Sequence, residues 1–161
     1  MFKKILLAIT PTGSNDHILE EAIALAKLSN GELMLLHVLS ASDQSYPVPL
    51  YPGAGSVYEG ALREEAIKNY AQQWEIYERD NFEFIKALTA QAANAGVKAE
   101  FTQSPGDAGN MICKLAETWN ADLIMLGRRG HSGLKELFLG SVSNYVLHHA
   151  PCSVLTIQGA S

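Results

Sequence analysis

The sequence has few cysteines, few charges and no long apolar run, and each shortage excludes a class of protein. Only two cysteines occur in 161 residues, so no disulfide framework holds the chain and a reducing cytoplasm is the expected location. Charged residues make up 18% and the formal net charge is −5, which argues against a dedicated nucleic-acid binder. No apolar run approaches the length that spans a bilayer. We therefore expect neither a nucleic-acid nor a membrane partner.

The composition is that of a globular protein, with hydrophobic residues at 47%. A chain of this length suits one domain, so we expect a single domain over residues 1–161. Short apolar runs, typical of strands covered on both faces, alternate with segments that have apolar residues at helical spacing. The predicted strands are 4–9, 32–39, 97–103, 121–126 and 153–158, and the predicted helices are 16–30, 59–94, 108–119 and 141–149.

This alternation predicts an α/β fold with a single open five-stranded parallel sheet and helices on both faces. Residues 41–58 contain three prolines and two glycines and are expected to form a long loop. One helix over 59–94 would be about 52 Å long, so one helix and two helices with a break near residues 80–81 both fit. Its aromatic stripe of Tyr70, Trp74 and Tyr77 is expected to face the core.

Glycines cluster after the fourth predicted strand, in the run Gly127-Arg128-Arg129-Gly130-His131-Ser132-Gly133, and Gly140-Ser141 open the last predicted helix. Glycine lets a ligand approach the backbone without a Cβ in the way, and free N–H groups in such turns and at helix N-termini attract anions. Parallel α/β sheets bind ligands at the carboxyl ends of their strands. The spacing is neither that of a P-loop nor the dinucleotide fingerprint. A phosphate site is predicted; a structural turn followed by a helix N-cap is the alternative.

The spacing Gly127-x-x-Gly130, nine residues, Gly140-Ser141 resembles the nucleotide-binding signature of the universal stress protein family. The resemblance covers the whole chain, from "KKILLAI" and "LMLLHVLS" to "ICKLAETWNADLIMLGRRG" and "HHAPCSVLTIQ". It implies a Rossmann-like fold similar to the adenine nucleotide alpha hydrolases, usually in a homodimer. For the subgroup with this signature it also implies binding of ATP, or of ADP or AMP, together with Mg²⁺ carried by the nucleotide.

The resemblance also implies a role for individual residues. It places the main chain of Gly127 and Gly130 against the ribose and the phosphates. It also places Gly140, Ser141 and Val142 around the β- and γ-phosphates, and the backbone of Val38 against adenine. After the first strand the family usually has an aspartate that contacts the ribose, whereas this chain has Thr10, which supplies a hydroxyl but no carboxylate. The implied site comprises Thr10, Pro11, Val38, Gly127, Arg128, Gly130, His131, Gly140, Ser141, Val142 and Ser143.

The function that fits best is a non-enzymatic, ATP-responsive regulator of the stress response, whose nucleotide-bound state is read by an unidentified partner protein. A slow ATPase and a dimerisation module with a vestigial nucleotide site are the alternatives. No catalytic residue is predicted, because no general base stands beside the glycines. No metal-binding residue is predicted either, because the neighbouring His148 and His149 would point about 100° apart on a helix. The resemblance also places the last strand, 153–158, at one edge of the sheet. Because this strand has no charge or proline, we expect a homodimer through this edge unless the 41–58 loop covers it.

Overall fold

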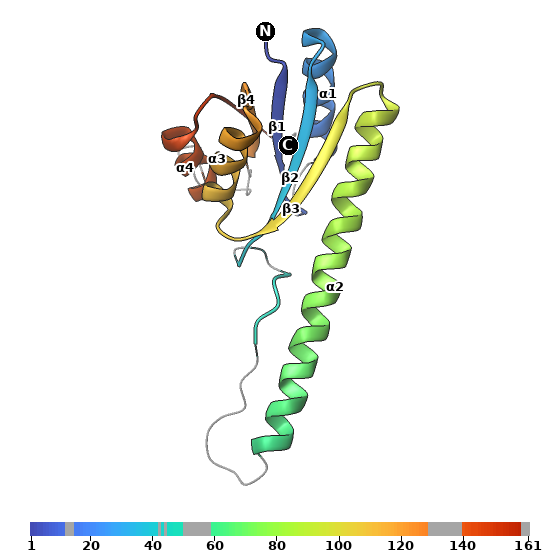
Figure 1. The fold of residues 1–161 in the computed structure, drawn as a ribbon, viewed down its shortest axis with the longest axis vertical. Helices are drawn as coiled ribbons and strands as arrows, with labels where there is room; N and C mark the ends of the chain where they lie inside the picture. The colour runs from blue at the N-terminus through green and yellow to red at the C-terminus, as the bar shows by residue number, and fades with distance from the viewer. Residues whose placement is uncertain (12–14, 42, 44, 50–58, 129–139, 159–161) are drawn as a thin grey trace.

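The computed structural model describes residues 1–11, 15–41, 43, 45–49, 59–128 and 140–158. Five parallel strands form one sheet in the order β3-β2-β1-β4-β5 (Figure 1). This confirms the predicted open parallel sheet and places β5 at one edge. The strands are β1 (Lys4–Ile9), β2 (Glu32–Leu39), β3 (Ala99–Pro105), β4 (Leu123–Arg128) and β5 (Ser153–Gln158).

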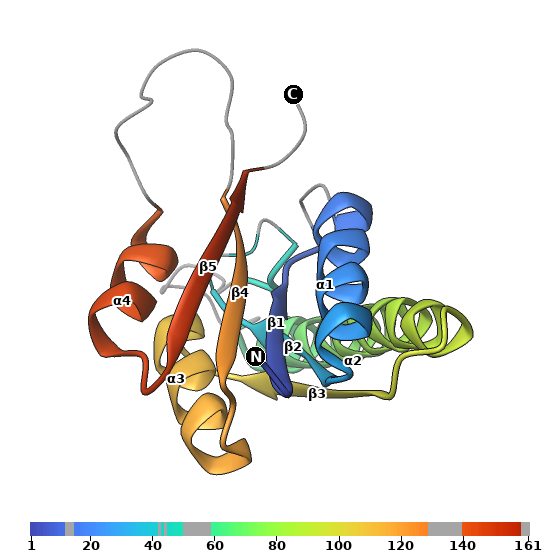
Figure 2. The ribbon, with the colours of Figure 1, turned by 90° about the horizontal axis from the view of Figure 1, so that it is seen from above.

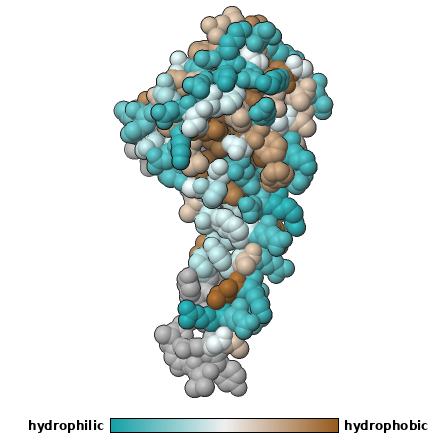
Figure 3. All heavy atoms as spheres, viewed as in Figure 1, coloured by the Kyte–Doolittle hydropathy of each residue, from teal (hydrophilic) through white to brown (hydrophobic). Residues whose placement is uncertain are grey.

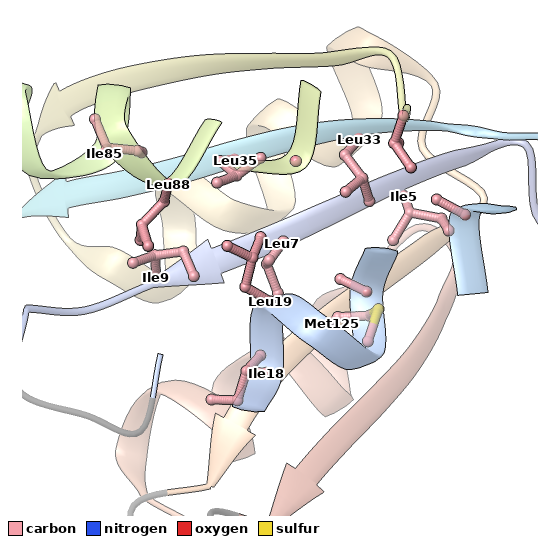
Figure 4. Close-up of a cluster of buried hydrophobic side chains, with 14 of the residues drawn as sticks. Ile5, Leu7, Ile9, Ile18, Leu19, Leu33, Leu35, Ile85, Leu88 and Met125 are labelled. Atoms are coloured by element: carbon pink, nitrogen blue, oxygen red, sulfur yellow. The ribbon is translucent and has the colours of Figure 1, made fainter. Parts of the chain in front are cut away.

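Helices cover both faces of the sheet, as predicted (Figure 2). On one face α1 (Asn15–Ser29) and α2 (Glu59–Asn94) pack on an apolar cluster whose strand residues include Ile5, Leu7 and Ile9 of β1 (Figure 4). On the other face α3 (Ala108–Trp119) and α4 (Ser141–His149) pack on a second cluster. Successive side chains of a strand point to opposite faces, so continuous apolar runs such as that of β1 supply both clusters.

Three helices end in the same hydrogen-bonded turn, with a left-handed residue at Asn30, Gly96 or Asn120. In each turn the next N–H bonds five residues back, as Val97 does to Ala92 and Ala121 does to Ala116, which is the Schellman pattern. The predicted strand starts at 97 and 121 were therefore wrong by two residues. The buried Val97 and Ala121 close the helix ends, and β3 and β4 begin after them.

The helix α2 is continuous over its 36 residues, so the alternative of a break near residues 80–81 is wrong. All of its buried residues lie from Tyr77 onward, and the part before them, residues 59–76, projects beyond the sheet (Figure 1). The visible surface of this projecting part is mostly hydrophilic (Figure 3). In the part of the chain that the structure describes, no helix combines the length and apolar character that a membrane crossing needs.

The aromatic stripe of α2 reaches the core only at Tyr77, because the sheet ends before Tyr70 and Trp74, which are half-buried. Trp74 and Tyr77 instead pack against Tyr46 of the β2–α2 connection, with ring centroids 5.2 and 5.7 Å away. Residues 45–49 therefore lie along α2, which packs on β3 and β2. The described part of the connection does not cover the β5 edge, and residues 50–58 of the same predicted loop lie outside the described residues.

One glycine sets the distance between α3 and α4. A Cβ on Gly109 would lie 2.6 Å from Cδ1 and 3.1 Å from Cβ of Tyr145, atoms that α4 holds in place. Gly109→Ala is therefore expected to lower the free energy of unfolding by about 1–3 kcal/mol, the usual cost of overpacking. Denaturant unfolding measures this change. Gly60→Ala is the matched control, because its Cβ would meet no described atom within 4 Å; an equal loss in both variants would contradict the packing argument.

Candidate functional site

The strand order reverses between β1 and β4, and the predicted site residues gather at the carboxyl ends of these strands and of β2. Ile9 pairs with His37, so Thr10 and Val38 stand side by side one residue further along. Ala8 pairs with Leu126, and Gly127 and Arg128 continue β4 past that pair. This is the switch point at which open parallel sheets bind ligands.

Gly127 has a structural reason to be glycine. A Cβ at this position would lie 2.4 Å from Cδ1 of Ile18, which packs from α1 against the end of β4. The sequence suggested that the missing side chain lets a ligand approach, whereas here it makes room for a helix. Ile18 contacts Gly127 on the face of the strand that α1 covers, and its side chain has rotatable bonds. This contact therefore does not exclude a ligand on the opposite face of the strand.

The N-terminus of α4 has no side-chain cap among the described residues, in contrast to that of α3. At α3 the Asp107 carboxylate caps the helix by accepting the backbone N–H of Asn110 at 2.9 Å. At α4 the N-cap is Gly140, which has no side chain, and no described residue supplies a side-chain cap in its place. Gly140 has φ −55° and ψ 157°, which suit any residue, and a Cβ there would meet no described atom within 4 Å. Neither backbone strain nor packing against the described residues explains this glycine.

The first turn of α4 lies on the same face of the sheet as Val38. Val38 is 8% exposed and belongs to the apolar cluster that also holds Leu126 and Val146, and Val142 packs against that cluster. Ser143 is also buried, while Ser141 is exposed. A helix that connects β4 to the parallel β5 runs against the strands, so its N-terminus lies at their carboxyl ends (Figure 2).

The structure therefore brings together seven of the predicted site residues and the backbone of an eighth. Gly130 and His131 lie outside the described residues, and Arg128 is described by its backbone alone, opposite Gln158 of β5. Pro11, which follows Thr10, lines a groove of about 660 Å³ along α2 together with Tyr46, Tyr77 and Phe84. The residues that gather at the switch point are Thr10, Val38, Gly127, Gly140, Ser141, Val142 and Ser143.

Sequence reasoning missed a buried polar chain that begins one residue before Val38. His37 is 0% exposed, Asp43 is 8% exposed, and the Tyr77 hydroxyl donates to Oδ2 of Asp43 at 2.7 Å. Burial and the neighbouring Asp43 carboxylate raise the pKa of Tyr77 above its ordinary value. A histidine inside the apolar run "ELMLLHVL" was the available signal, because a buried polar side chain needs a partner.

No three His, Cys, Asp or Glu side chains come together to hold a metal ion within the described ranges.

Comparison with known proteins gives one consistent family. Residues 1–158 match the sequence profile of the universal stress protein family. The universal stress protein Sll1388 of Synechocystis is 36% identical over 159 residues, which cover 98% of each chain.

Solved structures show the same fold at lower identity. The hypothetical protein MJ0577 superposes with a TM-score of 0.73 at 21% identity, over 100% of this chain and 99% of the other. A universal stress protein solved in complex with cAMP has a TM-score of 0.58 at 17% identity, over 99% and 98% of the two chains. The Archaeoglobus fulgidus protein, solved in complex with dAMP, has a TM-score of 0.58 at 16% identity, over 96% and 97%.

Proposed function

The chain belongs to the universal stress protein family. We propose that it binds an adenine nucleotide, with ATP as the preferred one, at the switch point of its sheet. In this proposal residues 1–161 form one domain that acts as a homodimer, and a partner protein reads the nucleotide-bound state. The protein works as a regulator and not as an enzyme, since the ribose position offers the Thr10 hydroxyl and no carboxylate that could serve as a general base.

The N-terminus of α4, which no described side chain caps, is the observation that carries this proposal. Free N–H groups and the positive end of the helix dipole attract phosphate. At α3 the Asp107 carboxylate already fills that position, whereas at Gly140 the position is empty of described atoms and borders the carboxyl ends of the strands. Phosphates at Gly140 would leave the ribose at Thr10 and the base at Val38. The complexes of two structural neighbours with cAMP and dAMP support an adenine nucleotide in this fold.

Calorimetric titration of the purified protein with ATP, ADP and AMP, beside an assay of ATP turnover, tests the proposal. We expect ATP to bind in the micromolar range without turnover above the rate of the buffer. Turnover that disappears in Gly140→Asp would identify the slow ATPase instead. A folded, dimeric protein that binds none of the three nucleotides would identify the dimerisation module.

Thr10→Asp is expected to tighten ATP binding several-fold. A carboxylate bonded to a ribose hydroxyl makes a charge-assisted hydrogen bond worth about 1.5–3 kcal/mol, against about 1 kcal/mol for a neutral one. Titration calorimetry measures the change. Thr10→Asn is the matched control, because asparagine has the same shape as aspartate but carries no charge. Equal tightening in both variants, or weaker binding in Thr10→Asp, would contradict this account of the ribose position.

A further inference from the structure

A hydrogen-bonded chain beside the switch point fixes the tautomer of His37. The Gln103 side chain donates from Nε2 to the backbone oxygen of Glu78 at 3.0 Å, so its Oε1 faces the other way. That oxygen lies 3.4 Å from Nδ1 of His37. An amide oxygen only accepts, so Nδ1 carries the proton of the neutral ring, and Nε2 is left as an acceptor.

Nε2 of His37 faces a second acceptor. It lies 3.8 Å from Oδ2 of Asp43 and has no hydrogen-bond partner among the described residues. A buried ring nitrogen without a partner is costly, and a lone pair opposite a carboxylate adds repulsion. One proton on Nε2 would remove both penalties, because the ring would then donate to the carboxylate.

Asp43 in turn holds the β2–α2 connection. Its N–H donates to the oxygen of Ser40 at 2.9 Å, and its own backbone oxygen accepts the N–H of Tyr46 at 3.1 Å. Its carboxylate accepts the Tyr77 hydroxyl, and Tyr46 packs edge-on against Trp74. Asp43 therefore links the end of β2 to Tyr46 and to α2.

We infer that His37 and Asp43 form a proton-dependent latch on the β2–α2 connection, and that the proton it takes up regulates the adjoining nucleotide site. A proton from solvent binds Nε2 of His37, the new N–H donates to Oδ2 of Asp43, and the separation shortens to about 2.8 Å, the length of a charge-assisted bond. The link to the nucleotide rests on the proposed function; the latch rests on the contacts of His37 and Asp43 alone.

The surroundings of His37 determine when the latch closes. The connection places Asp43 beside the ring, and the Tyr77 hydroxyl of α2 donates to the same carboxylate oxygen. β1 and β3 place Ile9 and Gln103 opposite His37, and neither residue titrates. Burial lowers the pKa of His37, and the Gln103 hydrogen bond and the Asp43 charge oppose this with smaller effects. The folded protein therefore takes up the proton below about pH 6.5, the ordinary value for histidine.

The latch adjoins the candidate site at two points. Val38, whose backbone is proposed to meet adenine, follows His37 directly in β2. Pro11, at the end of β1, shares its groove with Tyr46 and Tyr77, two residues that Asp43 holds. A closed latch fixes the residues beside Val38 and Pro11 before the nucleotide binds. We therefore expect ATP to bind more tightly when His37 is protonated, in mild acid, than when it is neutral.

The first experiment follows Trp74, the tryptophan beside the latch, in a Trp119→Phe background. Its emission between pH 8 and pH 5 should change with the same midpoint as the imidazole resonance of His37, which His37→Gln identifies by its loss. The carboxamide of His37→Gln does not titrate, so emission in that variant should stay flat. Asp43→Asn should move the His37 midpoint to lower pH, because the charge that favours the protonated ring is removed. Flat emission with His37 present, or an unchanged transition in His37→Gln, would overturn the latch.

The second experiment compares ATP affinity of the unmodified protein and His37→Gln at pH 7.5 and pH 5.5. The ratio of the two dissociation constants cancels the titration of ATP itself. We expect the ratio to shift by about threefold or more in favour of the unmodified protein at pH 5.5. A constant ratio with ATP bound would overturn the link and leave the proposed function intact. Absence of ATP binding at both pH values would overturn the proposed function, and Trp74 emission would still decide the latch.

Discussion

Gly140→Asp is expected to abolish ATP binding, with a loss of affinity of at least about a hundredfold. The substitution places a carboxylate at the N-cap of α4, where the proposal puts the β- and γ-phosphates. Like charges brought together in a binding site cost several kcal/mol, and each 1.4 kcal/mol is about tenfold in affinity. Titration calorimetry with ATP measures the loss.

The fold should survive this substitution, so that a loss of ATP binding can be distinguished from a loss of stability. The backbone of Gly140 suits any residue and its Cβ position is free of described atoms. Aspartate is also among the best N-cap residues, so α4 gains a cap of the kind that α3 has in Asp107. Gly60→Asp adds the same charge on the projecting part of α2 and should leave ATP affinity unchanged. ATP bound normally by Gly140→Asp would refute the proposed phosphate position.

Thr156→Pro is expected to turn the proposed homodimer into a monomer. β5 is an edge strand without charges, and its Leu155 side chain is 39% exposed. Such an edge offers unpaired N–H and C=O groups to a second copy across a two-fold axis. Proline removes a donor and obstructs pairing. Light scattering at micromolar concentration measures the change.

Successive N–H groups of a strand point to opposite sides, so proline at one position can disturb β4 instead of the dimer. Leu155→Lys avoids this problem, because it keeps the backbone and adds a charge to the exposed edge. Leu62→Lys is its matched control, since Leu62 is similarly exposed, at 47%, on the projecting part of α2. A monomeric unmodified protein, or equal weakening by both lysines, would count against the β5 interface.

The strands and helices were predictable because their apolar patterns are long and regular. The ends of these elements were harder to predict. Val97 and Ala121 are apolar and precede strands, but their backbone N–H groups form the hydrogen bonds that end the preceding helices. The glycines show the same limit at the candidate site. Gly127 and Gly140 look alike in sequence, yet only the folded chain reveals that Ile18 fills the space beside one and that no described atom fills the space beside the other.

The latch was beyond sequence reasoning for a different reason. Its parts come from β2, the connection, α2 and β3, so that His37 and Gln103 meet across 66 residues of sequence. A lone histidine in an apolar strand signals a buried partner without saying which residue it is. No local pattern distinguishes Asp43 or Tyr77 from the other polar residues of their segments.

The central place of β1 has a consequence for the order in which the chain can assemble. β1 leaves the ribosome before the other four strands of its sheet. It pairs with β2 on one side and with β4 on the other, where Ile5 meets Leu123 across 118 residues of sequence (123 − 5). During synthesis its β4 side therefore stays bare until most of the chain has emerged. Closure of so long a loop is slow, and a bare apolar strand invites misassembly. A nascent chain of this topology is at greatest risk of aggregation just before β4 arrives.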